Sequence, residues 1–308
     1  MNIEVLLTEA EIANEFAEAL EARDLPEKFF YWSPLSVRAW LDLSQDAASD
    51  AQRNAWAAVG AAAEKLARQF QGPVSVVSFG AGDGVKDVSL LKGLQRAGLQ
   101  VKYFPVDASQ PLLELACAAG EDAEIESLGI KADIASPVHV VLASDAAESP
   151  KLYVMAGNTL GGFDPLDQLR HLAECLHTED RLIVDGELFD AASPAQDRRP
   201  LMRRFALAPL AGMGISEEDG ELRLEHKQDE RHAGLHMLTR HFQAGHDLHI
   251  TVGGQSVTMQ RGERVFLNFR YLYTPEAFRW LVSRHAGLKI VEEIIDAEAR
   301  MMTAICSR

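Results

Sequence analysis

Three segments that combine glycines or acids with apolar runs have the composition of a nucleotide-binding site. The first is VVSFGAGDG, where Gly80, Gly82 and Gly84 follow a strand-like apolar run. Glycines at such a turn let a ligand approach the backbone, and the helix that starts there offers free N–H groups. A tight turn without a ligand uses the same residues, so this motif alone is weak evidence.

Two carboxylates follow in the expected order. Asp107 ends the apolar segment YFPVDAS, 27 residues after Gly80. An acid at that strand end can accept hydrogen bonds from both ribose hydroxyls of an adenosine; it can equally cap the helix that begins near Ser109. In KADI, Asp133 can bind the adenine amino group while Ile134 packs on the ring. Together the three segments predict adenosine binding.

The glycine spacing distinguishes between adenosine cofactors. The dinucleotide fingerprint needs a third glycine five residues after the first, and that position is Val85. The sequence contains no GxxxxGK[ST] phosphate loop. A G-x-G turn, an acid at the second strand end and an acid in the next loop are the arrangement of S-adenosylmethionine sites. The sequence therefore predicts S-adenosyl-L-methionine as the cofactor, with an NAD(P)-dependent oxidoreductase as the less favoured alternative.

A fourth segment, AGNTLGGFDP, follows another apolar strand. In an open parallel sheet this strand end faces the ligand crevice. The small residues Gly157, Asn158 and Gly162 leave space there for a donor methyl group and its acceptor. The end of the segment, Asp164-Pro165, is typical of a helix cap.

These segments belong to a regular alternation of strands and helices between residues 71 and 190, which predicts a parallel, doubly wound α/β sheet. Runs such as VSVVSF fit strands covered on both faces. The first 70 residues are predicted to be helical, with helices at 8–24 (capping box Thr8 and Glu11), 33–43 and 49–70.

The alternation stops after residue 190. From residue 221 the pattern predicts antiparallel strands with a Gly253-Gly254 hairpin turn, then a helix at 275–286 and two final strands. We predict a cofactor-binding domain of residues 1–192 and 271–308, with N-terminal helices, and an inserted α+β lid domain of residues 193–270.

Several segments are similar to motifs of one family. GNTLGGFDP is similar to G-S-T-I-G-N-[FL]-x-P, FGAGDGVKD to L-G-S-G-x-x-x-K-T, PVDAS to P-V-D-[VI]-S, KADI to A-D-[FY], and LPEKFFY to L-P-x-K-[WY]-F-Y-D. These motifs are those of the histidine-specific, S-adenosylmethionine-dependent methyltransferases, known for trimethylating histidine in ergothioneine biosynthesis. The resemblance implies a Rossmann-like class I fold with a seven-stranded, mostly parallel sheet. It also implies a cofactor site around Gly80, Lys86, Asp107 and Asp133.

The departures from this family concern its substrate residues. A segment from Gly262-Glu263 resembles the family's G-E-x-I-x-T-E-x-S-x-K-[FY], and there its imidazole-binding glutamate and serine correspond to Asn268 and Arg270. The family's amine-binding asparagine corresponds to Gly162, and a pocket methionine to His236. Asparagine plus arginine does not replace a glutamate that accepts an imidazole N–H. The resemblance therefore implies an acceptor other than histidine.

The remaining candidate residues suggest a carboxylate-bearing acceptor. In NFRYLY, strand alternation puts Asn268 and Arg270 on one face, and arginine matches a carboxylate with two hydrogen bonds. A surface arginine paired with an acid is the alternative. His236 or Tyr31 is a candidate base, if the acceptor arrives protonated; an ordinary solvated or core histidine is the alternative for His236.

Composition limits the partners. The chain has 308 residues, 25% of them charged, and a net charge of −16. An acidic surface disfavours nucleic acids and anionic membranes. The N-terminus has no signal-peptide pattern, and three distant cysteines suggest a reducing cytoplasm. Six histidines between residues 226 and 249 lack a ligand pattern, so no metal site is predicted. A basic run, Arg198 to Arg204, pairs internally or attracts an anion.

The combined prediction is a cytoplasmic methyltransferase that uses S-adenosyl-L-methionine on a small, polar, amino-acid-like molecule. The altered positions Gly162, Asn268 and Arg270 leave open a catalytically silent protein that only binds the cofactor or its product. The acceptor atom and the oligomeric state are not determined by the sequence.

Overall fold

The computed structural model describes residues 1–46, 50–61 and 63–308, which form two compact units. The first unit consists of Met1–Leu6, Ala48–Leu188 and Tyr273–Arg308, and the second of Leu7–Ala47 and Phe189–Leu272. The sequence prediction assigned the N-terminal helices to the cofactor-binding domain. The contacts instead group Leu7–Ala47 with the second unit.

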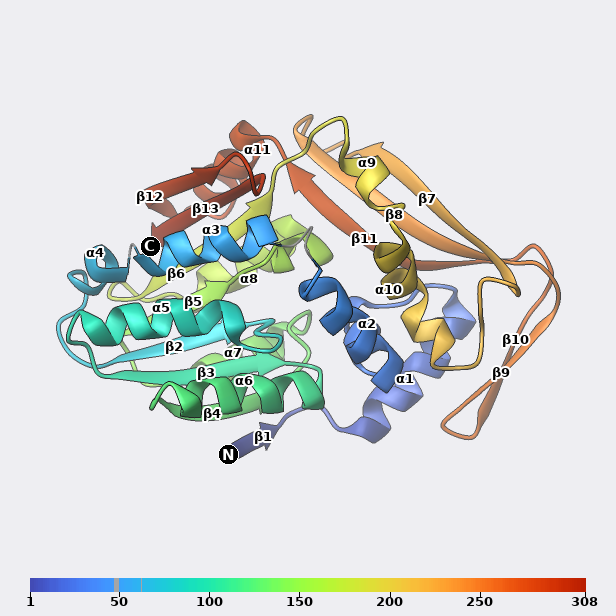
Figure 1. Cartoon of the computed structure of the whole chain (residues 1–308), viewed down its shortest axis with the longest axis horizontal. Helices are drawn as coiled ribbons and strands as arrows, with labels where there is room; N and C mark the ends of the chain where they lie inside the picture. The colour runs from blue at the N-terminus through green and yellow to red at the C-terminus, as the bar shows by residue number, and fades with distance from the viewer. Residues whose placement is uncertain (47–49, 62) are drawn as a thin grey trace. The chain divides into compact units, whose positions relative to one another are not determined.

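The first unit contains an eight-stranded sheet in the order β1-β4-β3-β2-β5-β6-β13-β12 (Figure 1). β13 is antiparallel to both neighbours, whereas the pairs from β1 to β6 are parallel. This confirms the predicted doubly wound, Rossmann-like fold. The strands are β1 (Asn2–Val5), β2 (Val74–Phe79), β3 (Val101–Asp107), β4 (Glu126–Lys131), β5 (Lys151–Met155), β6 (Arg181–Glu187), β12 (Lys289–Asp296) and β13 (Met301–Ser307).

The sheet has one strand more than the seven expected. The additional strand is β1, which pairs in parallel with β4. Its sequence, NIEV, is too short to carry a recognisable alternation of apolar and polar residues.

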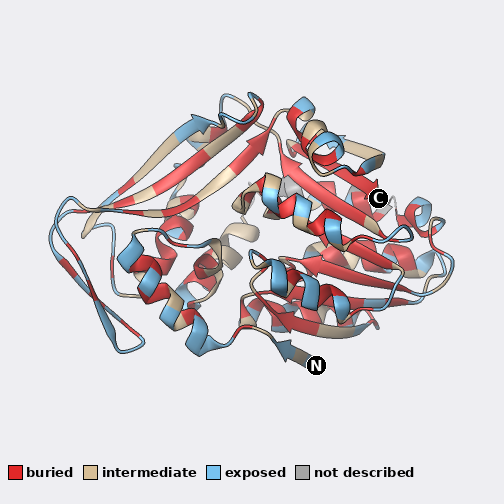
Figure 2. Cartoon of the chain, turned by 180° about the vertical axis from the view of Figure 1, so that it is seen from behind, coloured by how far each residue is buried: buried red, intermediate tan, exposed pale blue. Residues whose placement is uncertain are grey.

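Helices cover both faces of this sheet. α3, α5 and α6 lie together on one side, and α7 and α8 contact each other on the other side (Figure 1). Every residue of β2 is consequently buried, and the central strands are red in Figure 2. The helical elements are α3 (Asp50–Ala61), α4 (Ala63–Ala67), α5 (Val85–Arg96), α6 (Gln110–Asp122), α7 (Pro137–Asp145), η3 (Thr159–Gly162), α8 (Pro165–Cys175), α11 (Pro275–Trp280) and η4 (Leu281–His285).

Two helical predictions differ from these elements. The segment expected as one helix at 49–70 forms α3 and α4, and residues 49 and 62 lie outside the described residues. α7 was not predicted, because its apolar residues are not confined to one stripe; Val138, Val141 and Leu142 remain exposed.

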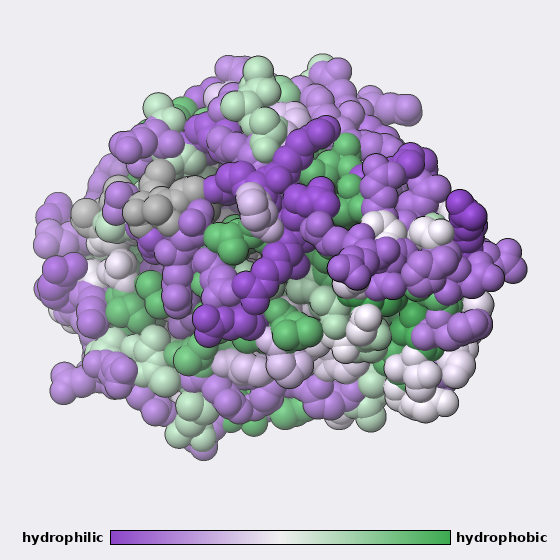
Figure 3. Space-filling model, turned by 45° about the vertical axis from the view of Figure 1, so that its right-hand side comes forward, coloured by the Kyte–Doolittle hydropathy of each residue, from purple (hydrophilic) through white to green (hydrophobic). Residues whose placement is uncertain are grey.

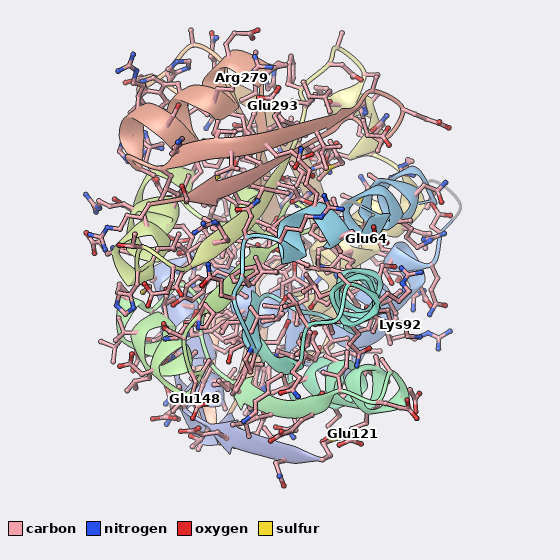
Figure 4. The ribbon with its side chains drawn as sticks, turned by 90° about the vertical axis from the view of Figure 1, so that its left-hand side faces the viewer. Glu64, Lys92, Glu121, Glu148, Arg279 and Glu293 are labelled. Atoms are coloured by element: carbon pink, nitrogen blue, oxygen red, sulfur yellow. The ribbon has the colours of Figure 1, made fainter. Side chains whose placement is uncertain are left out.

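In the C-terminal part of the first unit, an ion pair joins α11 to β12. Figure 4 shows Arg279 of α11 beside Glu293 of β12. The guanidinium donates two hydrogen bonds to the carboxylate, at 2.6 and 2.7 Å. This two-pronged geometry fixes the helix against the edge strand.

The second unit combines two small sheets with helices. The sheets have the orders β11-β8-β7 and β10-β9. The predicted Gly253-Gly254 turn is confirmed, because Val252 pairs with Gln255 across it. The elements are α1 (Glu9–Ala22), η1 (Glu27–Tyr31), α2 (Pro34–Ser44), α9 (Ser193–Gln196), α10 (Pro200–Ala211), β7 (Gly220–Gln228), β8 (Leu235–Ala244), β9 (Leu248–Val252), β10 (Gln255–Met259) and β11 (Arg264–Tyr273).

The helices α1 and α2 belong to this unit for a physical reason. α1 begins at the predicted capping box of Thr8 and Glu11 and packs on the β9–β10 hairpin. The segment after α1 joins β11 through two backbone bonds: Leu25 N–H donates to Phe266 O, and Phe266 N–H donates to Arg23 O. α2 in turn packs on α10.

The face of the molecule in Figure 3 is predominantly hydrophilic, with small apolar patches, in keeping with the charged composition. Among the described residues, no helix is both long and apolar enough to cross a membrane.

Candidate functional site

The glycine turn after β2 is attached to the neighbouring strand. Gly80 and Ala81 both donate their N–H groups to Val106 O, at 2.8 and 3.3 Å. Gly80 has a φ of +69°, a conformation that costs glycine little. A Cβ at this position would lie 2.6 Å from Thr159 Cγ2, so no larger residue fits. The absent side chain therefore lets the turn pack directly against the start of η3.

Asp107 closes the other side of this turn. Its carboxylate accepts the N–H of Gly82 on Oδ2 and the N–H of Ser109 on Oδ1, both at 2.9 Å. Burial raises the pKa of Asp107, against the lowering effect of these backbone bonds. A carboxylate offers about four acceptor positions, so two bonds leave capacity for ribose hydroxyls. The N-cap of α6 is Ser109 rather than Asp107.

The loop after β4 contributes Asp133 and Ile134. Ile134 is buried, and its Cδ1 lies 3.5 Å from a Cβ built on Gly80, so the two residues face the same small space. Its carbonyl accepts a 2.8 Å hydrogen bond from Gln168 Nε2. Asp133 is partly exposed; its Oδ1 accepts the N–H of Ala135, and its own N–H donates to His139 Nδ1.

Lys86, in the first turn of α5, reaches the end of β5. Its Nζ lies 3.2 Å from Ala156 O. A Cβ on Gly157, which has a φ of +79°, would lie 3.1 Å from the same Nζ. The ammonium group has three donors, so it can bind an anionic group while keeping the carbonyl bond.

A buried acid that the sequence analysis did not identify holds the loop after β5. Asp185, at the end of β6, accepts the N–H groups of Gly157 and Asn158, at 2.9 and 2.8 Å, and the Trp56 indole N–H at 2.9 Å. Burial raises its pKa in spite of these three bonds. The Asn158 Oδ1 accepts the N–H of Glu187, so its side chain supports the loop. Gly162 ends η3 in the same segment.

In the second unit, Tyr31 and Asn268 meet on one acid. The Tyr31 hydroxyl donates to Glu27 Oε1 at 3.0 Å, and Asn268 Nδ2 donates to Glu27 Oε2 at 3.1 Å. Burial raises the pKa of Glu27 to about 7, although Asn268, Arg240 and Tyr31 all lower it. Glu27 was missed because a single acid in LPEKFFY gives no sign of what the fold places around it.

Asn268 connects this acid to a charged cluster, which we call the two-arginine cluster (Asp197, Arg240 and Arg270). The Asn268 Oδ1 accepts a 2.9 Å hydrogen bond from Arg240 Nη1. Arg240 and Arg270 both pair with Asp197, at 2.8 and 2.9 Å. Arg240 and Asp197 are 2% exposed, whereas the Arg270 side chain is 20% exposed. Asp197 and Arg240 were not identified from the sequence.

His236 lies apart from these residues. Its ring stacks on Phe189 with a centroid distance of 3.7 Å, and its Nδ1 lies 3.1 Å from His226 Nε2. Burial and the neighbouring His226 lower its pKa. It is four residues from Arg240 along β8, which corresponds to about 13 Å. Of the second-unit candidates, the structure therefore joins Tyr31, Asn268 and Arg270 in one network and leaves His236 outside it.

Metal ligation has no support in the part of the chain that the structure describes. Within residues 1–46, 50–61 and 63–308, no three His, Cys, Asp or Glu side chains are grouped so that they could hold a metal ion.

Comparison with known proteins gives one family match along the chain. The sequence profile described as "Histidine-specific methyltransferase, SAM-dependent" matches residues 12–308. No curated protein is significantly similar in sequence.

Solved structures that resemble this chain include three methyltransferases. An S-adenosylmethionine-dependent methyltransferase from Clostridium acetobutylicum is 12% identical, with a TM-score of 0.48 over 88% of this chain and 98% of its own. The CurJ carbon methyltransferase is 12% identical, with a TM-score of 0.48 over 86% and 56%. CalS10 from Micromonospora echinaspora, an amino pentose methyltransferase with SAM bound, is 9% identical, with a TM-score of 0.40 over 82% and 91%.

Proposed function

Because this chain belongs to the histidine-specific, S-adenosylmethionine-dependent methyltransferase family, we propose that it methylates a small polar molecule that carries a carboxylate and is not histidine. The protein is a SAM-dependent methyltransferase with a Rossmann-like class I fold. Membership of this family argues against the alternative function considered from the glycine turn, that of an NAD(P)-dependent oxidoreductase. The identity of the acceptor is the part that is proposed.

We assign cofactor binding to the turn between β2 and α5 and to the two loops beside it. The residues are Gly80, Gly82, Lys86, Asp107, Asp133 and Ile134. The glycine turn, whose backbone carries no side chain at Gly80, and the acceptor capacity left on Asp107 support binding of an adenosine. Lys86 fits the carboxylate of the amino-acid part of the cofactor.

When bound, S-adenosylmethionine supplies an electrophilic methyl group on a positively charged sulfur. The protein's contribution is mainly to hold donor and acceptor in line, because proximity and orientation alone lower such a barrier by about 7–11 kcal/mol. Asp185 supports this by fixing the loop that carries Gly157 and Asn158. These small residues, with Gly162, are proposed to leave room for the acceptor.

The two-arginine cluster carries the proposal for the acceptor. Two guanidinium groups share the single carboxylate of Asp197, and Arg270 is the one that keeps contact with solvent. The cluster of Asp197, Arg240 and Arg270 by itself has one positive charge in excess. An acceptor carboxylate beside Arg270 would neutralise it.

The same network argues against histidine. A guanidinium has no acceptor atom, so Arg270 cannot accept an imidazole N–H, and the Asn268 Oδ1 already accepts a hydrogen bond from Arg240. Tyr31, Asn268 and Arg270 are therefore proposed to bind a different amino-acid-like molecule. His236, which the sequence predicts as an acceptor contact, stays a proposal, although it stacks on Phe189 outside the network.

The test is formation of S-adenosylhomocysteine, followed by mass spectrometry, with a panel of amino acids, hydroxy acids and their decarboxylated or esterified counterparts. We expect turnover of a carboxylate-bearing compound and at least a tenfold lower kcat/KM for its neutral counterpart. Arg270→Gln should raise the KM of that acceptor about 10- to 100-fold, while Arg223→Gln, on an exposed strand, should not.

Three results would contradict the proposal. Histidine as the best acceptor would restore the family's usual substrate. Equal turnover of a neutral counterpart would show that Arg270 does not recognise a carboxylate of the acceptor. Binding of S-adenosylmethionine without product from any compound would favour the silent binding protein.

A further inference from the structure

Glu27 is the titratable side chain around which the second-unit network is built. It begins η1, directly after Pro26, and is neither fully buried nor fully exposed. Both carboxylate oxygens are held, one by the Tyr31 hydroxyl and the other by the Asn268 amide. Because donors from η1 and from β11 each hold one oxygen, the orientation of the carboxylate is fixed, while the residue keeps partial exposure to solvent.

The hydrogen-bonding and charged groups of the Glu27 network come from four segments. Tyr31 belongs to the same turn, Asn268 and Arg270 to β11, Arg240 to β8, and Asp197 follows α9. Asp197 already pairs with both arginines, so the positive charge that reaches Glu27 is partly balanced. Desolvation outweighs the remaining stabilisation and raises the pKa of Glu27 to about 7.

We propose that Glu27 is the base that removes a proton from the acceptor molecule before methyl transfer. This inference rests on the proposed function, because it requires an acceptor bound to the network. An ammonium group has no free electron pair, and a hydroxyl group is a weak nucleophile, until a base removes its proton. A carboxylate beside the acceptor can remove that proton.

The step balances without a further reactant. The N–H or O–H bond of the acceptor breaks, its proton passes to a Glu27 oxygen, and the electron pair stays on the acceptor atom. That pair forms the new bond to the methyl carbon while the methyl–sulfur bond breaks and its electrons remain on sulfur. Glu27 returns the proton to solvent before the next turnover.

The structure favours Glu27 over the two bases considered from the sequence. Tyr31 donates its hydroxyl hydrogen to Glu27, so the phenol acts as a donor that orients the acid. His236 lies about 13 Å along β8 from Arg240, stacked on Phe189. Within the network Tyr31 is thus a hydrogen-bond donor, and His236 lies outside it.

The first test compares Glu27→Gln, Glu27→Asp and the exposed control Glu221→Gln, using the acceptor found in the panel. In the wild type, kcat/KM should rise about tenfold per pH unit and level off above about pH 7, as Glu27 loses its proton. Glu27→Gln should lower kcat about 10²- to 10⁴-fold and abolish this rise. Glu27→Asp should recover part of the rate, and Glu221→Gln should match the wild type.

The second test separates proton transfer from a structural role. The Tyr31 hydrogen bond lowers the pKa of Glu27, so Tyr31→Phe should move the rise in kcat/KM to higher pH and keep a measurable kcat. Infrared difference spectra of the free protein, wild type minus Glu27→Gln, should contain a carboxyl band that titrates near pH 7. Calorimetry should give the same affinity for S-adenosylmethionine in every variant, and circular dichroism spectra that match the wild type verify folding of the whole chain.

An unchanged kcat and pH profile in Glu27→Gln would overturn the inference, as would a change confined to KM, which indicates recognition alone. Loss of activity in Tyr31→Phe equal to that in Glu27→Gln would assign the base to Tyr31. If no acceptor in the panel is methylated, the proposed function itself fails, and this inference with it.

Discussion

Single carboxylates fix the loops of the first unit. Asp107 ends β3 and Asp185 lies near the end of β6, and each accepts N–H groups from the turn that follows a neighbouring strand. Buried acids in this arrangement are satisfied by backbone donors rather than by cations, and burial raises the pKa of both. Asp107 was found from its spacing, whereas Asp185 was not, because its partners lie 27 and 28 residues away and at Trp56.

Replacement of Asp107 tests the cofactor site at the residue scale. Asp107→Ala removes the acceptor proposed for the ribose hydroxyls together with the bonds to Gly82 and Ser109. We expect affinity for S-adenosylmethionine, measured by calorimetry, to fall at least 100-fold, since hydrogen bonds to charged groups contribute about 1.5–3 kcal/mol each. Asp122→Ala, at the exposed end of α6, is the matched control. Unchanged affinity in Asp107→Ala would remove Asp107 from the site.

Replacement of Asp185 tests loop support. Asp185→Asn keeps the size of the side chain but turns an amide N–H₂ toward at least one of three donors. A buried donor left unpaired costs about 1–3 kcal/mol, so we expect a loss of about 3 kcal/mol in the free energy of unfolding. Trp56→Phe, which removes one bond, should cost less. Urea denaturation measures both, and equal stability of Asp185→Asn and wild type would contradict this role.

At the scale of elements, the turn between β2 and α5 is constrained from two sides. It bonds to β3 through Val106 O and faces Thr159 at the start of η3. The network of the second unit depends in the same way on several elements, because η1, β8 and β11 each supply one of Glu27, Arg240 and Asn268.

Comparison of alanine variants at Gly80 and Gly98 distinguishes the effect of backbone strain from the effect of side-chain contact. Gly80 and Gly98 both have positive φ, but a Cβ on Gly98 meets nothing within 4 Å, whereas one on Gly80 meets Thr159. Each substitution by alanine should cost about 1 kcal/mol from the backbone conformation. Only Gly80→Ala should also weaken binding of S-adenosylmethionine, by tenfold or more in calorimetry. Equal affinity in the two variants would show that the space at Gly80 does not serve the cofactor.

At the scale of the whole molecule, acidic side chains pair with arginines of the predicted basic run. In the predicted basic run, Arg199 pairs with Asp46, Arg203 with Glu217, and Arg204 with Asp42. These pairs favour the internal alternative over attraction of an anion. The positive charge that remains relevant to an acceptor is therefore that of Arg270, within the two-arginine cluster.

Cofactor binding should protect the first unit selectively. S-Adenosylmethionine at 100 times its Kd stabilises the folded state by about 2.7 kcal/mol. Hydrogen exchange should slow at the turn of residues 80–85, after β3 and after β5, while β7 and the β9–β10 hairpin exchange as before. The Asp107→Ala protein is the control and should show no slowing. Protection confined to the second unit would place the cofactor elsewhere.

The sequence by itself determined the layer architecture and located the segments that we propose bind the cofactor. Apolar strands and amphipathic helices alternate with characteristic periods, and the glycine turn and Asp107 lie within or next to those elements, so local pattern and spacing were sufficient. β1 and α7 were missed because one is too short and the other has no polar stripe.

Only the tertiary structure decided which residues share a site. Glu27 and Asn268 are 241 residues apart, and Asp197, Arg240 and Arg270 come from three different segments. It also grouped the N-terminal helices with the second unit through backbone bonds between Arg23, Leu25 and Phe266. Such contacts depend on chain packing over long sequence separations, which local spacing does not encode. The desolvation that raises the pKa of Glu27 exists only once that packing has formed.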